Sequence, residues 1–215
     1  MRKVSLRERA PKGQILITFV LALALIIMGT GLAIDVSRAW QLDTDELSML
    51  SRAKDNALTN LNYIKFSANP ADATADMLAK TMSREGYTGR LEVWYYEVPN
   101  GTAVAHNGRQ VEATDADRYA AVLMQTSDTS PTVLSKMMGI DGIPIRNIQT
   151  YTLHSYATVQ VWRSSSTLGG YYVYDVKPAG SDGLAKYTLQ DKRAIASFEG
   201  YPDELKDALA DKFGR

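Results

Sequence analysis

The sequence contains no cysteine among its 215 residues. Disulfides, thiolate metal sites, iron–sulfur clusters and thiol catalysis are therefore excluded. An exported domain often relies on disulfides, so this chain must hold its fold together through its core. Hydrophobic residues make up 45% and charged residues 22%, which is the composition of a globular protein rather than a disordered one.

Motifs for chemistry are also scarce. The two histidines, His106 and His154, lack a carboxylate at metal-ligand spacing. Glu112, Asp115 and Asp117 offer the oxygen ligands that calcium prefers, but the EF-hand spacing is missing, so a solvated turn is favoured. The sequence contains no Gly-x-Ser-x-Gly elbow and no phosphate-binding loop. We therefore expect that the chain is not an enzyme and binds no cofactor or metal. An alternative hypothesis is a membrane-anchored hydrolase whose paired carboxylates come together only in the folded chain.

One long uncharged run dominates the N-terminal part of the chain. Twelve of the twenty residues from Ile15 to Ile34 are Leu, Ile, Val or Phe. On a membrane-insertion scale these supply roughly −4 to −7 kcal/mol. Twenty helical residues rise about 30 Å, the thickness of the hydrocarbon core of a bilayer. The run predicts a transmembrane helix over residues 14–35.

The flanks of this run predict its orientation. Residues 1–13 hold five basic residues and one acid, and the remainder of the chain carries a net charge of −4. The positive-inside rule then predicts a single-pass protein of the cell membrane, with a cytoplasmic leader at 1–13 and residues 36–215 outside. The acidic remainder also argues against nucleic-acid binding. Asp35, Arg38 and Trp40 are candidate polar and aromatic anchors where the helix leaves the membrane, with Asp35 and Arg38 spaced to form a local ion pair.

Periodicity outlines the rest of the fold. Apolar residues at helical spacing predict that the helix continues to about Phe66, with an extracellular extension over 36–69 whose apolar face includes Val36, Trp40 and Leu47. Residues 70–215 form the outer domain. A short helix over about 71–85 precedes several segments of period two, in which Asn107-Gly108 predicts a hairpin turn. Residues 131–138 predict one or two helical turns that stop at Gly139, and Pro202 begins a final helix. The predicted fold is α+β: a long N-terminal helix, an antiparallel sheet and a few short helices.

Several tyrosines fall in the predicted strands, where alternate side chains face opposite sides of a sheet. We therefore expect about half of them to be exposed, where they could contact proteins or glycans; the favoured interpretation of their number is that tyrosine simply suits strands. They are Tyr95, Tyr96, Tyr151, Tyr156, Tyr171, Tyr172 and Tyr174.

The segment KGQILITFVLALALIIMGTGLAIDVSRAW, residues 12–40, resembles the N-terminal segment of the TadE/TadG-like proteins of the Tad (Flp) pilus machinery. That family typically has a Gly before the span, here Gly13, and a Gly-rich exit followed by Ala-x-Asp-x-x-Arg-Ala, here from Ala33 to Ala39. Residues 133–157 also resemble the distal part of TadE-like proteins. The resemblance implies a pilin-like fold and a minor pilin or pilus-assembly protein whose helix contacts lipid and other pilus-assembly subunits.

Two forms of processing remain open. Prepilin-type cleavage between Gly13 and Gln14 fits the glycine, but the fifth mature position would be Thr18 where pilins carry Glu. Gly31 and Ala33 also satisfy a small-x-small signal-peptidase rule, although the helical pattern continues past them. The alternative function is a membrane-tethered extracellular binding or adhesion module without a link to pili, whose surface ligand is unknown.

Overall fold

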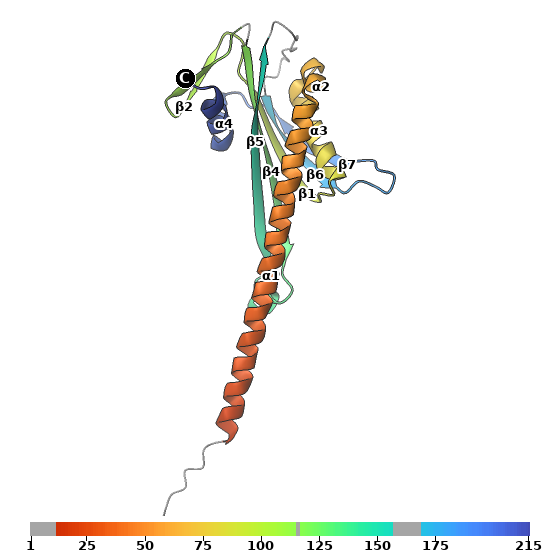
Figure 1. The fold of residues 1–215 in the computed structure, drawn as a ribbon, viewed down its shortest axis with the longest axis vertical. Coiled ribbons are helices and arrows are strands. Elements are labelled where there is room, and N and C mark those ends of the chain that lie inside the picture. Colours follow the sequence, from red (N-terminus) through yellow and green to blue (C-terminus); the bar gives the residue numbers. More distant parts are fainter. Residues whose placement is uncertain (1–11, 115–116, 157–168) are drawn as a thin grey trace, which may run out of the picture. The chain divides into compact units, whose positions relative to one another are not determined.

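The computed structural model describes residues 12–114, 117–156 and 169–215 (Figure 1). The chain divides into two compact units. The first contains residues up to Gln41 together with Thr129–Ile143, and the second contains Leu42–Asp128 and Pro144–Arg215. A long apolar helix, an antiparallel sheet and short helices make up the described residues, so the predicted α+β class is confirmed.

The N-terminal helix, α1, runs from Lys12 to Thr59 without interruption. A short helix, α2 (Leu61–Phe66), follows directly. The two are separated at Asn60, whose φ of −97° and ψ of 23° leave the helical region. The sequence predicted one helix to about Phe66 and missed this break, because no glycine or proline marks it.

The main sheet has five strands in the spatial order β5-β4-β1-β6-β7. Strand β1 pairs antiparallel with β4 on one side and β6 on the other, and β6 pairs antiparallel with β7. The order places β1, the first strand in the chain, at the centre of the sheet. The strands are β1 (Gly89–Glu97), β4 (Asp117–Pro131), β5 (Gly142–Tyr156), β6 (Gly169–Lys177) and β7 (Lys186–Arg193).

The hairpin predicted at Asn107-Gly108 is confirmed. It joins β2 (Ala103–His106) to β3 (Arg109–Glu112) in a separate two-stranded sheet. Both turn residues have positive φ, 50° and 76°, as the tight primed turns require. Three helical segments complete the second unit: α3 (Pro70–Arg84), η2 (Phe198–Gly200) and α4 (Asp203–Phe213). The first unit contains η1 (Ser135–Met138), where a short helix ending at Gly139 was predicted.

Both faces of the main sheet are buried in the second unit. One face packs on α3 and on the part of α1 from Leu50 to Ala57. The other packs on α4, η2 and the β2–β3 hairpin. Neighbouring residues of one strand therefore enter different cores: Tyr95 belongs to the first cluster and Tyr96 to the second. Figure 1 shows α3 and α4 flanking the strands.

The prediction that about half of the strand tyrosines are exposed is wrong. Five of the predicted residues are at most 7% exposed: Tyr95, Tyr96, Tyr151, Tyr172 and Tyr174. Tyr171 is half-buried, and the side chain of Tyr156 lies outside the described residues. Alternate side chains do point to opposite faces of the sheet, but other elements cover both faces, so these tyrosines are part of the hydrophobic core.

Candidate functional site

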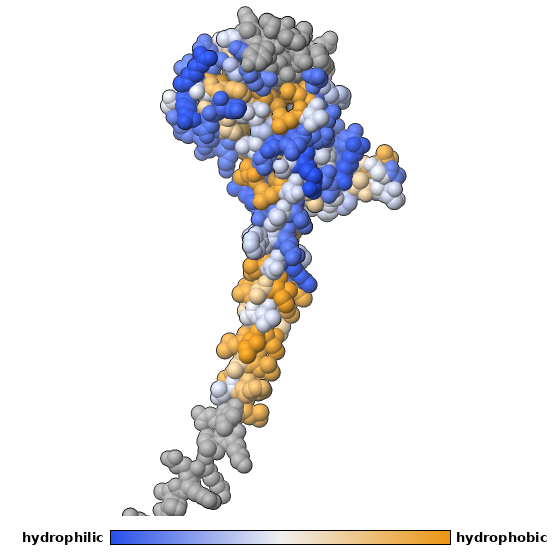
Figure 2. Space-filling view, in the orientation of Figure 1, coloured by the Kyte–Doolittle hydropathy of each residue, from blue (hydrophilic) through white to orange (hydrophobic). Residues whose placement is uncertain are grey.

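The first half of α1 presents an apolar surface to its surroundings (Figure 2). Nine large hydrophobic side chains between Leu16 and Ile27 are each 46–66% exposed. Monomeric soluble proteins rarely expose apolar patches of this extent, which usually mark a membrane or protein contact. The residues are Leu16, Ile17, Phe19, Val20, Leu21, Leu23, Leu25, Ile26 and Ile27.

By length and composition, α1 is one helix that is able to cross a membrane. Only 6% of its most apolar window is buried inside the protein, so this stretch is not the core helix of the described fold. Gly13 and Gln14 lie in the first turn of α1, and cleavage between them stays a prediction. The helix also passes through Ala33, the other candidate cleavage position, without a break.

Asp35 lies directly after the apolar run and binds a distant loop. Its Oδ1 accepts the backbone N–H of Val133 at 3.1 Å, and its Oδ2 accepts those of Leu134 at 3.0 Å and Ser135 at 2.7 Å. The carboxylate thus satisfies the free N–H groups where η1 begins, as an N-cap side chain does, but from another element. The side chain is 1% exposed. We call Asp35 and these three amides the Asp35 clamp.

The local pair predicted between Asp35 and Arg38 is not formed. Within the described part of the chain, no ion pair joins them, and Arg38 is exposed. The three amides offer Asp35 several charge-assisted hydrogen bonds in a buried position, which a solvated arginine on the same helix cannot match. Trp40 is 74% exposed, and its role as an interfacial anchor stays a prediction.

Gly31 lies one turn before Asp35 on the same helix face. A Cβ at Gly31 would lie 2.5 Å from the Cβ of Leu134, so only glycine lets the loop approach this closely. Gly31, Asp35 and Ala39 are buried at intervals of four residues. At its start, the predicted apolar face lies one residue too late in the sequence. The predicted residues Val36, Trp40 and Leu47 are 40–74% exposed.

A second acid on α1, Glu46, is buried in the second unit. It is 1% exposed, and its Oε2 accepts the Thr126 hydroxyl at 2.7 Å and the Asn147 amide at 3.2 Å. Among the described residues, its Oε1 has no hydrogen-bond partner. Desolvation raises the pKa of Glu46 above its ordinary value of 4.5, and the hydrogen bonds from Thr126 and Asn147 oppose this only in part. Sequence reasoning missed this site, although Glu46 shares a helix face with Leu50, Ala53 and Ala57.

Both histidines have acidic partners that lie far away in the sequence. His106 Nε2 lies 3.0 Å from Asp207 Oδ1, which links the β2–β3 hairpin to α4. His154 Nε2 lies 3.0 Å from Asp117 Oδ1, and its ring stacks on Tyr119. Within the described residues, no group of three or more His, Cys, Asp or Glu side chains is arranged to hold a metal. Asp115, the third member of the acidic cluster, lies outside those residues.

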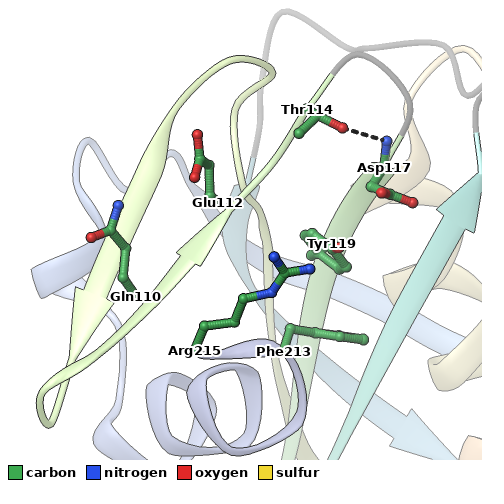
Figure 3. Close-up of a pocket in the computed structure, with 7 residues that line it drawn as sticks. All are labelled: Gln110, Glu112, Thr114, Asp117, Tyr119, Phe213 and Arg215. Carbon is green, nitrogen blue, oxygen red and sulfur yellow. Dashed lines mark hydrogen bonds between the residues drawn. The ribbon is translucent and has the colours of Figure 1, made fainter.

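A pocket of about 290 Å³ lies between β3, β4 and the end of α4, and Figure 3 draws the residues that line it. Two carboxylates, Glu112 and Asp117, and the guanidinium of Arg215 line it, with Tyr119 and Phe213 on one side. The Thr114 hydroxyl accepts the backbone N–H of Asp117 at 3.1 Å. A pocket with charges of both signs beside aromatic rings suits a small polar ligand.

Comparisons with known proteins give no match: no family model, no curated protein and no solved structure matches this chain.

Proposed function

We propose that this chain is a minor pilin or pilus-assembly protein of a Tad/Flp-like pilus system, anchored in the cell membrane by α1. Its N-terminus lies in the cytoplasm, and the sheet domain lies outside. The observation that carries the proposal is the apolar surface of α1 from Leu16 to Ile27, which the described fold leaves uncovered. The resemblance of residues 12–40 to TadE/TadG-like proteins supplies the link to pili.

The energetics of α1 support anchoring. Because the nine large apolar side chains are 46–66% exposed, leaving each of them in water costs part of the roughly 1.5–3 kcal/mol that full burial of an exposed side chain supplies. A bilayer removes this cost, and the helix satisfies its own backbone hydrogen bonds in lipid. The same surface suits the packing of helices from neighbouring subunits, which is how a pilin-like assembly would use it after leaving the membrane.

The absence of cysteine makes the topology simple to test, because any introduced cysteine is the only one. We propose Ser5→Cys for the leader and Leu184→Cys for the domain, where Leu184 is 65% exposed. In intact cells, a membrane-impermeant maleimide should label Leu184→Cys and spare Ser5→Cys until the membrane is permeabilised. Labelling of both, or recovery of the protein in the cytosol, contradicts the proposed anchoring.

The anchor itself is tested by placing a charge in the span. Leu21→Lys puts a cation at the middle of the apolar run, at a cost of about 2.5–3.5 kcal/mol on the insertion scale. We expect it to reduce the membrane-bound fraction after carbonate extraction. Leu184→Lys is the matched control, because it makes the same change at an exposed position of the domain.

The link to pili needs its own experiment. Co-purification with other Tad components, and loss of pili on deletion of the gene, would support it. N-terminal sequencing of the mature protein then separates an anchor starting at Met1, a processed pilin starting at Gln14 and a secreted domain starting at Ile34. The pocket between β3, β4 and α4 favours the alternative of a tethered binding module. If the chain is such a binding module, deletion of its gene should leave pili intact and abolish attachment to a ligand.

A further inference from the structure

The loop that joins β4 to β5 carries an apolar tip. Four of its hydrophobic side chains are exposed: Val133 at 60%, Met137 at 78%, Met138 at 40% and Ile140 at 39%. They lie within eight residues of each other, and the only side-chain charge between them is that of Lys136. Such a group of exposed apolar side chains at the end of a hairpin indicates a contact that the described chain does not supply. We call these four residues the β4–β5 tip.

The tip is fixed to the part of α1 that leaves the apolar run. Leu134 lies against Gly31, and the Asp35 clamp holds the amides of residues 133–135. Gly31 lies inside the uncharged run that ends at Ile34. At 1.5 Å per residue, the loop therefore contacts the helix within about 6 Å of that end. All of these residues belong to the same compact unit.

Six backbone amides of the loop have hydrogen-bond partners within the first unit. The amides of Val133, Leu134 and Ser135 bond to Asp35. Those of Met137, Gly139 and Ile140 bond to carbonyls of Leu134, Lys136 and Ser135. In lipid, a backbone polar group without an internal partner costs several kcal/mol, so non-helical backbone needs such internal pairing.

We propose that the β4–β5 tip inserts into the outer leaflet of the bilayer beside α1, as a second membrane contact of the chain. This inference rests on the proposed anchoring of α1, because continuity with its apolar run sets the depth of the tip. The tip lies next to the end of the apolar run of α1, so lipid is the apolar material that it would contact there. Lys136 sits between the apolar side chains, and its long stem allows the ammonium to reach the headgroups.

Spin labelling tests the insertion. The full chain, with Met137→Cys as its single cysteine, is labelled with a nitroxide and reconstituted in phosphatidylcholine–phosphatidylglycerol vesicles. Collisions with oxygen, which concentrates in lipid, are compared with collisions with a water-soluble nickel chelate. Leu25→Cys in the span and Leu184→Cys in the domain are the lipid and water references. They are matched to Met137→Cys in being exposed apolar side chains.

We expect the labels at Met137 and Leu25 to favour oxygen and the label at Leu184 to favour nickel. Val133→Cys is the second variant, because its side chain is also exposed and should give the same preference as Met137. A nickel preference at Met137 with an oxygen preference at Leu25 overturns the insertion and leaves the anchor standing. Low access to both reagents at Met137 indicates a protein cover and also overturns it. A nickel preference at Leu25 overturns anchor and tip together.

Discussion

The Asp35 carboxylate and the backbone N–H of Ser135 lie 2.7 Å apart across one hundred residues of sequence. Together with Val133 and Leu134, this contact joins the exit of the apolar helix to the loop between two strands of the sheet. The contact lies within the first unit, which contains both the end of the apolar run and the segment from Thr129 to Ile143.

Asp35→Asn should release this loop. An amide side chain keeps one acceptor oxygen, but its NH₂ group faces N–H donors at the other position, so at least one hydrogen bond is lost. We expect faster amide hydrogen exchange at residues 133–135, measured by mass spectrometry on the full chain in lipid. Asp45→Asn is the control, because Asp45 is an exposed acid on the same helix. Unchanged protection in Asp35→Asn would show that the clamp does not hold the loop.

Gly31→Ala should disturb the same loop for a steric reason. The new Cβ would meet the Cβ of Leu134 at 2.5 Å, and neither atom can rotate away. Overpacking of this kind costs about 1–3 kcal/mol, more than the roughly 0.5–1 kcal/mol that alanine gains over glycine in a helix. We expect a lower thermal midpoint and weaker protection of residues 133–135.

Gly29→Ala is the matched control for this substitution. Nothing lies within 4 Å of a Cβ at Gly29, so only the gain in helix propensity remains. The two variants should therefore shift the thermal midpoint in opposite directions. Equal shifts would mean that the approach of Leu134 to Gly31 contributes little to stability.

Glu46→Gln should change how stability depends on pH. Burial raises the folded-state pKa of Glu46 above the value of 4.5 expected in the unfolded chain. The contribution of Glu46 to the stability of the wild type is therefore fully present below pH 4.5 and is lost as the pH rises through the raised pKa. Glutamine cannot ionise, so the variant lacks this loss.

Denaturant unfolding of wild type and Glu46→Gln across this pH range measures the effect. We expect similar free energies of unfolding at acidic pH and a more stable variant at neutral pH. Glu199→Gln removes an exposed carboxyl and should follow the wild type. A difference between wild type and Glu46→Gln that does not vary with pH would show that burial leaves the titration of Glu46 unchanged.

Local sequence patterns predicted much of the fold. The uncharged run and the helical spacing after it predicted α1, and Asn107-Gly108 predicted the hairpin, because each depends on residues close in sequence. Gly139, with φ of 81°, ends η1 as a left-handed glycine, where a stop was predicted.

The candidate site could not be predicted in the same way. The partners of Asp35 and Glu46 lie 80 or more residues further along the chain, and no local pattern specifies them. A signal did exist on α1 itself, because Asp35 and Glu46 lie on the face that also carries Ala39, Leu50 and Ala53. An acid on an apolar stripe has to find hydrogen-bond partners when it is buried, so both positions were recognisable as sites of tertiary contact.

The buried tyrosines allow a comparison of two hydroxyl groups in the sheet core. The Tyr201 hydroxyl donates a hydrogen bond to the backbone oxygen of Tyr95 at 3.1 Å. The hydroxyl of Tyr95 itself is buried and has no partner among the described residues. Tyr201→Phe should therefore lower the free energy of unfolding by about 1 kcal/mol, the net value of a typical hydrogen bond.

Tyr95→Phe should have the opposite effect or none, because it removes a buried hydroxyl that makes no hydrogen bond. Burying such a group costs about 1–3 kcal/mol in mutational data, and phenylalanine avoids that cost while filling the same space. Urea unfolding of both variants in detergent, with the folded baseline checked by near-UV circular dichroism, compares them directly. If Tyr95→Phe destabilises the protein as much as Tyr201→Phe, the Tyr95 hydroxyl has a partner in solution, and a bound water is then the group to look for.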